Sequence, residues 1–275
     1  MNYFDAVVLG IVEGLTEFLP VSSTGHLTIA EKALGLDVND VAVTGFTAVI
    51  QMGAIAAVIV YFAKDIWGIA KAWTLGLVKP EYRGLLDHRM GWYVIVGSIP
   101  VGVTGLLFKD LIKGDLRSLW VVAIALIAWS AVMWYAERVA RQERSEKQLG
   151  LKDALLIGGA QCISLVPGVS RSGATISTGL LLGLDRVAAT RLSFFLSIPA
   201  LTAAGLFEMK DALSGSISTG ETLVGTAVAF VVAYASVAWL LKFVAHHSIA
   251  WFTPYRVALG AVILVLLGTG AMGAV

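Results

Sequence analysis

Long uninterrupted apolar stretches restrict the fold of this chain more than any other feature of its sequence. Stretches of about 18 or more apolar residues recur along the chain, and each is long enough to cross the ~30 Å hydrocarbon core of a bilayer. These stretches are continuous and do not alternate with a period of two, which argues against a β-barrel. The sequence therefore predicts an all-α integral membrane protein.

Composition and charge agree with a membrane location. Hydrophobic residues make up 57% of the chain and charged residues only 14%, whereas soluble domains carry about 25% charged residues. The formal net charge of +1 provides no basic field that would attract nucleic acid, so membrane lipids are the expected surroundings and nucleic acid is not an expected partner. A single cysteine, Cys162, excludes an internal disulfide.

Six transmembrane helices are expected from the apolar stretches. Their approximate ranges are 45–63, 91–108, 119–136, 190–207, 222–241 and 254–273. Basic residues cluster in two linkers, 64–89 and 138–152, which the positive-inside rule places in the cytoplasm. The linker 208–221 has one basic residue and is expected on the outside. An alternating path through the six helices satisfies all three assignments.

Two further apolar stretches, residues 6–30 and 154–182, are interrupted near the middle by proline and small polar residues. Irregular backbone of this kind cannot face lipid and must be buried in protein or line a watery cavity. We therefore expect each stretch to form a re-entrant helix-loop-helix hairpin. LPVSSTG at 19–25 aligns with VPGVSRSG at 166–173 when one extra residue is allowed.

This similarity predicts an inverted-topology repeat, because an odd number of membrane crossings separates the two hairpins. The chain would form a single membrane domain over 1–275. Its first half would cover about 1–136 and its second half about 154–275, with a cytoplasmic linker at about 137–153. The two hairpins are expected to meet near the middle of the membrane.

The first hairpin carries the motif EGLTEFLPVSSTGH, which contains two glutamates. Glu13 and Glu17 are four residues apart, so a helix places them on one face. Two neighbouring buried carboxylates repel each other, unless one is protonated, a cation bridges them or an arginine neutralises them. A solvated helix end is the alternative, but apolar residues flank the pair. Acids inside membrane segments generally serve a function, so we interpret this pair as functional.

Small hydroxyl residues and a histidine follow the same glutamates. Each hydroxyl taken alone is readily explained by packing or helix capping. His26 taken alone is explained equally well as a buried imidazole whose hydrogen bonds are satisfied within the protein. Together with the acids, however, Ser22, Ser23, Thr24 and His26 supply a nucleophile, a base and a cation site within one short segment. The combination is what points to chemistry.

The second hairpin carries PGVSRSGAT at 167–175, which supplies the opposite charge. Arg171 stands between Ser170 and Ser172 in a glycine-containing turn that opens a helix, and such a turn presents backbone N–H groups to an anion. The guanidinium adds paired donors that suit phosphate oxygens. The alternative is that Arg171 only neutralises the glutamates of the first hairpin.

Taken together, these groups favour phosphoryl chemistry on a membrane lipid. Carboxylates can hold a divalent cation, an arginine can stabilise the developing charge, and a hydroxyl or a water can attack in line. The membrane setting suggests a substrate with a long apolar tail and a phosphate head.

The two motifs, together with VIQMG at 49–53, resemble those of the undecaprenyl-pyrophosphate phosphatases, also called bacitracin-resistance proteins. The resemblance covers essentially the whole chain. It implies hydrolysis of undecaprenyl diphosphate to the monophosphate and inorganic phosphate, which recycles the lipid carrier for peptidoglycan synthesis. It also implies a bacterial cytoplasmic (inner) membrane location, a site open to the periplasmic face, and a requirement for a divalent cation, Mg²⁺ or Ca²⁺.

The resemblance also implies roles for individual residues. Glu13 and Glu17 match the family's essential acidic pair, with metal binding assigned to both, and Ser23 matches its proposed nucleophile. His26 matches the acid/base histidine, and Arg171 matches the phosphate-binding arginine. The remaining polar lining of the substrate site is expected from Ser22, Thr24, Gly168, Ser170, Ser172, Gly173 and Thr175. The sequence leaves open whether Ser23 or water attacks, which cation and polyprenyl chain length are preferred, and whether the protein is a homodimer.

Two other classes of protein compete with this interpretation. A polyprenyl-phosphate flippase is one, because inverted repeats with broken helices are typical of transporters. Lipid phosphatases related to acid phosphatases are the other, because SSTGH resembles their PSGH element. That second family also requires a lysine-to-arginine-proline motif and a histidine paired with aspartate, neither of which is found here. The remaining histidines, His88, His246 and His247, are expected in linkers.

Overall fold

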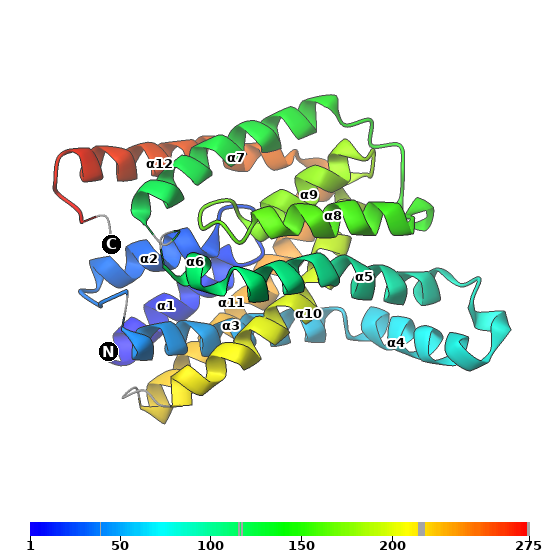
Figure 1. The fold of residues 1–275 in the computed structure, drawn as a ribbon, viewed down its shortest axis with the longest axis horizontal. Helices are drawn as coiled ribbons and strands as arrows, with labels where there is room; N and C mark the ends of the chain where they lie inside the picture. The colour runs from blue at the N-terminus through cyan, green and yellow to red at the C-terminus, as the bar shows by residue number, and fades with distance from the viewer. Residues whose placement is uncertain (39, 115, 117, 214–217, 274–275) are drawn as a thin grey trace.

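The computed structural model describes all residues from 1 to 275 except 39, 115, 117, 214–217 and 274–275. Its described residues form a bundle of helices (Figure 1) with one isolated bridge between Arg144 and Leu184. The elements in chain order are α1 (Tyr3–Thr16), α2 (Ser23–Ala33), α3 (Val41–Tyr61), α4 (Ala63–Val78), η1 (Pro80–Tyr82), α5 (Leu86–Leu107), α6 (Lys109–Lys113), α7 (Leu119–Val139), η3 (Glu146–Gln148), α8 (Leu151–Ile163), α9 (Arg171–Leu181), α10 (Arg186–Leu213), α11 (Thr219–His246), η4 (Ile249–Phe252) and α12 (Thr253–Gly268).

Six helical segments in the described part of the chain are long and apolar enough to cross a membrane. They are Val41–Tyr61, Leu86–Leu107, Leu119–Val139, Arg186–Phe207, Thr219–His246 and Ile249–Gly268. Each overlaps one predicted transmembrane helix, so the protein is confirmed as an all-α integral membrane protein. The last helix ends at Gly268 and not at residue 273 as predicted. The linker between α10 and α11, which the sequence predicts on the outside, is shorter than predicted because α10 extends to Leu213. Residues 214–217 of that linker lie outside the described residues.

The first basic linker contains a helix that the sequence reasoning missed. Helix α4 packs along α5 at the right-hand end of the bundle in Figure 1. Its polar residues Lys64, Asp65 and Lys71 interrupt the apolar pattern, so the sequence predicts only a basic linker over 64–89. In the structure Trp73 of α4 makes an edge contact with Trp92 of α5, with ring centroids 5.5 Å apart.

Two helix-loop-helix hairpins, α1–α2 and α8–α9, enter the bundle from opposite ends. Figure 1 shows α1 starting at the left end, α8 starting at the right end, and the two turns lying in the interior between them. This arrangement is what an inverted repeat would produce. The re-entrant position of the hairpins in a bilayer stays a prediction.

Each hairpin packs against a helix of the other predicted half. Helix α1 lies on α11, and α8 lies on α5. Both contacts are close because glycine removes the side chain at the crossing, as at many helix contacts in membranes. A Cβ added at Gly10 would lie 2.6 Å from the carbonyl oxygen of Gly225, and one added at Gly158 would lie 2.0 Å from that of Gly97.

The hairpins share a common register from their first residues onward. Asp5 accepts a hydrogen bond from the Asn2 N–H at the start of α1, and Asp153 accepts one from the Gly150 N–H at the start of α8, both at 2.8 Å. The same sequence separation relates three further pairs, which are Gly10 with Gly158, Glu13 with Gln161, and Ser22 with Ser170. The hairpins therefore align without the extra residue that the motif comparison required.

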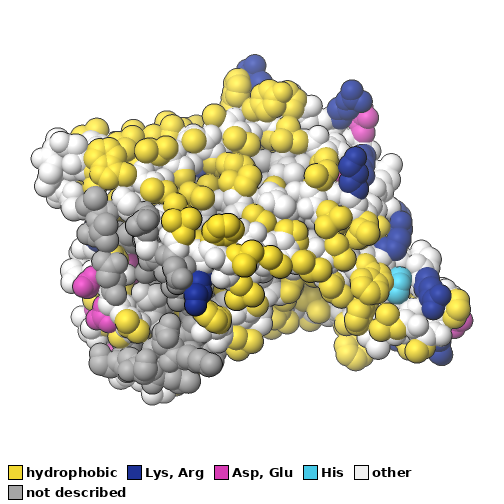
Figure 2. Space-filling view, viewed as in Figure 1, with side chains coloured by type: hydrophobic (Ala, Val, Ile, Leu, Met, Phe, Trp, Pro, Cys, Tyr) yellow, Lys and Arg dark blue, Asp and Glu magenta, His cyan; other side chains and the backbone are white. Residues whose placement is uncertain are grey.

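The surface agrees with a membrane environment and shows a polarity along the bundle. Figure 2 shows hydrophobic side chains over most of the visible face. Lys and Arg side chains gather mainly towards the right-hand end, where Figure 1 places α4 and the linker between α7 and α8.

Candidate active site

Each hairpin turn ends on a serine with an unusual backbone conformation. Ser22 has φ 77° and ψ 96°, and Ser170 has φ 74° and ψ 120°. Non-glycine residues adopt such conformations at a cost of about 1–3 kcal/mol, and residues of this kind concentrate at functional sites. Each serine directly precedes a helix, so the turn projects the next side chain, Ser23 in one hairpin and Arg171 in the other, from the first turn of that helix.

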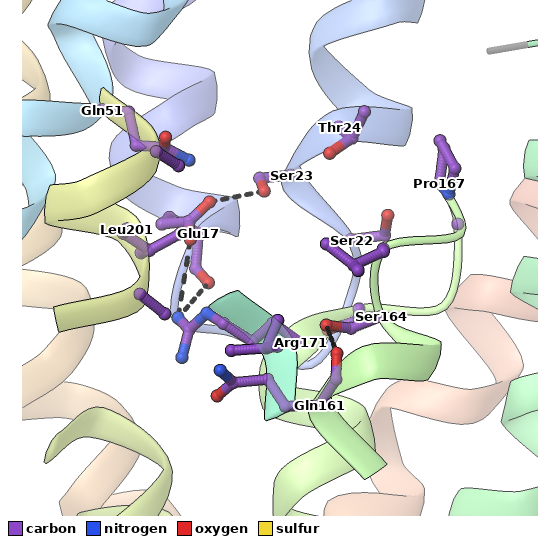
Figure 3. Close-up of a pocket in the computed structure, with 16 residues that line it drawn as sticks. Glu17, Ser22, Ser23, Thr24, Gln51, Gln161, Ser164, Pro167, Arg171 and Leu201 are labelled. Atoms are coloured by element: carbon purple, nitrogen blue, oxygen red, sulfur yellow. Dashed lines mark hydrogen bonds and ion pairs between the residues drawn. The ribbon is translucent and has the colours of Figure 1, made fainter. Parts of the chain in front are cut away.

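The two hairpins meet, as the sequence predicted, and an ion pair joins them. Arg171 Nη2 lies 3.5 Å from Glu17 Oε1 and 3.4 Å from the Glu17 carbonyl oxygen, while Arg171 Nη1 donates to the Ser193 carbonyl oxygen at 3.2 Å. The Ser172 hydroxyl adds a second link by donating to the Leu19 carbonyl oxygen at 3.0 Å. The acid of one half and the arginine of the other therefore share one buried site (Figure 3).

Glu17 also contacts the predicted nucleophile. The Ser23 hydroxyl donates to Glu17 Oε2 at 2.5 Å, so one carboxylate holds both the hydroxyl and the guanidinium. A carboxylate within hydrogen-bond reach of a hydroxyl can accept its proton during nucleophilic attack. This geometry favours Glu17 as the base for Ser23.

These groups line a cavity of about 160 Å³ between the two hairpins, α3, α5 and α10. Its polar lining includes most of the predicted residues, which are Glu17, Ser22, Ser23, Thr24, Gly168, Ser170 and Arg171. Gln51, Gln161 and Ser164, which the sequence reasoning had not assigned, complete the polar wall. Figure 3 shows these side chains arranged around one space.

A second cavity of about 250 Å³ adjoins the first, because Ser23, Thr24 and Gln51 belong to the walls of both. It lies between α2, α3 and α6, with Glu13 of α1 and the start of the α8–α9 turn also in its walls, and it includes Glu31. Helices α2, α3 and α6 are at the left end of the bundle in Figure 1, opposite the basic linkers. The polar site therefore has its wider extension towards the end with fewer basic residues.

Glu13 is the feature of this wall that fits a cation. Its side chain is completely buried, and neither carboxylate oxygen has a hydrogen-bond partner among the described residues. A cluster of three or more Asp, Glu, His or Cys is also lacking in the described part of the chain. Mg²⁺ is commonly held by one or two carboxylates together with substrate phosphates. Glu13 and Glu17, with the hydroxyl and amide oxygens nearby, match that pattern.

Three of the predicted lining residues lie behind the turn of the second hairpin instead of in the cavity. The Thr175 hydroxyl donates to Ser193 Oγ at 2.7 Å, and the Gly173 N–H donates to Ser170 Oγ at 3.2 Å. Ser172 is completely buried and lies 3.2 Å from Ser170 Oγ through its own hydroxyl. These residues shape the turn that presents Arg171.

His26 lies on another face of α2. Its Nδ1 is 2.7 Å from the Ser22 carbonyl oxygen, and its Nε2 is 2.6 Å from Tyr255 Oη, with the two rings stacked. Because a carbonyl can only accept, Nδ1 donates, and Nε2 of the neutral ring accepts from the tyrosine hydroxyl. His26 does not belong to the described walls of either cavity.

Arg256 is a residue of the site that the sequence reasoning missed. It is completely buried in α12 and donates to carbonyl oxygens of both hairpin turns, namely Pro20 at 3.0 Å, Gly168 at 2.9 Å and Val169 at 3.0 Å. It also donates to Ser130 Oγ at 3.1 Å. An arginine inside an apolar stretch was the available signal, since intramembrane charges are generally functional.

The remaining histidines do not form a second site. His88 was expected in a linker but is buried within α5, where Nδ1 lies 3.2 Å from the Ala72 carbonyl oxygen. His246 was also expected in a linker and is instead the last residue of α11. The histidine–aspartate pair of the acid-phosphatase-related enzymes therefore has no counterpart among the described residues.

The fold and the site together define a polytopic helical membrane protein with a buried centre built for phosphoryl transfer. Comparison with known proteins is consistent with this class. A family model described as bacitracin resistance protein BacA matches residues 6–262. The chain belongs to this family.

Its relatives match over nearly their full lengths. Undecaprenyl-diphosphatase 1 of Streptomyces coelicolor is 60% identical over 268 residues, which cover 97% of this chain and 96% of the relative. Undecaprenyl-diphosphatase of Acidothermus cellulolyticus is 56% identical over the whole of both chains, and that of Mycolicibacterium smegmatis is 53% identical over the same share.

Proposed function

We propose that this protein hydrolyses undecaprenyl diphosphate to undecaprenyl monophosphate and inorganic phosphate. The observation that carries the proposal is the contact of Glu17 with both Ser23 and Arg171 at a cavity between the two hairpins of a helical membrane protein. The names of the relatives point to the same reaction. Recycling of the lipid carrier for peptidoglycan synthesis, and with it bacitracin resistance, would follow from that reaction.

The residues suggest an in-line displacement at the terminal phosphorus. Glu17 accepts a proton from the attacking Ser23 hydroxyl, or from a water in its place, as the new P–O bond forms. The P–O bond to the lipid-linked phosphate breaks, and undecaprenyl monophosphate leaves. If Ser23 attacks, a water then cleaves the phosphoserine and releases phosphate. Arg171 stabilises the charge that develops on the phosphoryl oxygens.

Glu13 and Glu17 would hold a divalent cation, Mg²⁺ or Ca²⁺. When bound, the cation would neutralise phosphate charge beside the attacking group. The buried carboxylate of Glu13 supports this cation site, because it has no hydrogen-bond partner in the described structure. Glu13 lies one helical turn before Glu17, so both carboxylates can face the same cavity system.

The proposed location is the bacterial inner membrane, with the site open to the periplasm. The basic residues of α4 and of the linker between α7 and α8 favour a cytoplasmic position for the right-hand end in Figure 1. The cavity beside α2 and α6 lies towards the opposite end. A diphosphate released on the outer side would reach it without crossing the membrane.

A flippase acting through the same inverted repeat is the rival, and the hydroxyl–carboxylate contact favours the phosphatase. The test is phosphate release from undecaprenyl diphosphate by the purified protein in detergent, where transport has no meaning. Glu17→Ala and Arg171→Ala should each lower kcat by about 10³-fold or more, because each removes a group that acts on transition-state charge or proton transfer. Arg138→Ala, which removes a guanidinium lying over Trp134 on α7, serves as the control. Wild-type turnover by Glu17→Ala or Arg171→Ala would contradict the proposal.

A further inference from the structure

Gln161 is a buried polar residue that the mechanism above does not use. It lies near the end of α8, its side chain is completely buried, and neither amide atom has a hydrogen-bond partner among the described residues. Leaving a buried polar group unpaired costs about 1–3 kcal/mol. Because Gln161 lies at a cavity wall, a ligand in the cavity could form the missing hydrogen bonds.

The position of Gln161 points to an anionic ligand. It lines the same cavity as Arg171, and Figure 3 shows both side chains at that cavity. The two terminal nitrogens of Arg171 contact Ser193 and Glu17, whereas Nε has no partner in the described structure. The cavity wall therefore holds two unused N–H donor groups, one from Arg171 and one from the Gln161 amide.

Comparison of the two hairpins explains why residue 161 is an amide. Gln161 corresponds to Glu13 in the common register, and both side chains are completely buried without hydrogen-bond partners among the described residues. The two side chains differ in charge and in the ability to donate a hydrogen bond. A carboxylate suits a cation and repels phosphate, while an amide can donate to phosphate without adding negative charge. The paired positions thus divide the site into a cation side and an anion side.

We propose that Gln161 is a substrate-binding residue whose amide N–H group, together with Arg171 Nε, donates to oxygens of the diphosphate head group. The proposal deepens the function proposed above and rests on it. It assigns to Gln161 a share of ground-state affinity for the diphosphate and no part in proton transfer.

The test compares two substitutions of similar size in purified protein. Gln161→Met removes both polar atoms, and Gln161→Glu replaces the donor with a negative charge. A hydrogen bond to a charged group is worth roughly 10- to 100-fold in affinity. Gln161→Met should therefore raise the KM for undecaprenyl diphosphate, and the inhibition constant for inorganic pyrophosphate, by about 10-fold, with kcat within about threefold of wild type. Gln161→Glu should raise both constants further.

Thermal stability distinguishes a substrate-binding role of Gln161 from a role in stabilising the fold. Gln161→Met removes an unpaired buried amide, so its Tm in detergent without ligand should equal or exceed that of wild type. Thr202→Val is the matched control, because the Thr202 hydroxyl is also buried without a partner in the described structure but lines a separate apolar groove. It should leave KM and the pyrophosphate constant unchanged.

Unchanged KM and pyrophosphate inhibition in Gln161→Met would overturn the inference, as would a lowered Tm with unchanged inhibition. Absence of phosphate release by the wild-type protein would instead overturn the proposed function. In that event, a Tm increase caused by pyrophosphate in wild type and lost in Gln161→Met would still support the anion site.

Discussion

Arg256 provides a direct test of how the two hairpin tips are held in register. Arg256→Met keeps a side chain of comparable length and removes the donors to Pro20, Gly168 and Val169. At about 1 kcal/mol for each hydrogen bond, between the typical values for membrane interiors and for charged donors, the three bonds amount to about 3 kcal/mol. If the catalytic arrangement of Glu17 and Arg171 depends on this link, kcat should fall by about 100-fold.

The assay is phosphate release in detergent, with Tm measured on the same samples. Arg256→Lys retains the charge on a single ammonium group. Its kcat should fall by about 10-fold, since the ammonium can replace some of the hydrogen bonds to the hairpin carbonyls. Ser130→Ala removes the hydrogen bond from Arg256 to a side chain of α7, outside the hairpins. Its kcat should stay within about threefold of wild type, because that bond does not position a hairpin tip. A kcat for Arg256→Met close to wild type would refute the reasoning, and so would an equal loss in Ser130→Ala.

Three further predictions concern packing, backbone strain and the cation. Gly158→Ala should lower the free energy of unfolding by about 1–3 kcal/mol, because its Cβ would lie 2.0 Å from the Gly97 carbonyl oxygen. The adjacent Gly159→Ala meets no atom within 4 Å and should be neutral or stabilising in the same thermal denaturation; equal destabilisation would contradict the packing argument. Ser22→Gly should raise stability by up to about 2 kcal/mol by relieving a positive φ. Ser170→Gly should gain about 1 kcal/mol less, because it also loses the cap to Gly173, and a larger gain at Ser170 would refute this comparison. Chelation with EDTA should abolish phosphate release, and excess Mg²⁺ or Ca²⁺ should restore it; full activity in EDTA would exclude the proposed cation.

Much of the candidate site could be predicted from local patterns in the sequence. The contact between Glu17 and Arg171 was predictable because two intramembrane charges of opposite sign, each in an interrupted apolar segment, have few other ways to be buried. The contact between Ser23 and Glu17 was not predictable, because it depends on the direction in which α2 leaves its turn. That direction aims Ser23 at Glu17 and turns His26 towards Tyr255. Ser23 and His26 were expected to act together. Only the tertiary structure shows that Ser23 contacts Glu17 while His26 contacts Tyr255.

The amino-acid sequence by itself determined the membrane-spanning class, the six long helices and the two interrupted hairpins, because hydrophobic length and helix-breaking residues act locally. It also determined which charges had to find partners away from lipid. The tertiary structure alone decided that Arg256 holds both hairpin turns, that Gln161 faces the cavity unpaired, and that Glu13 and Gln161 occupy corresponding places. These features depend on how separate helices approach and rotate against one another, and close contacts at Gly10 and Gly158 set that geometry through packing between residues far apart in the chain.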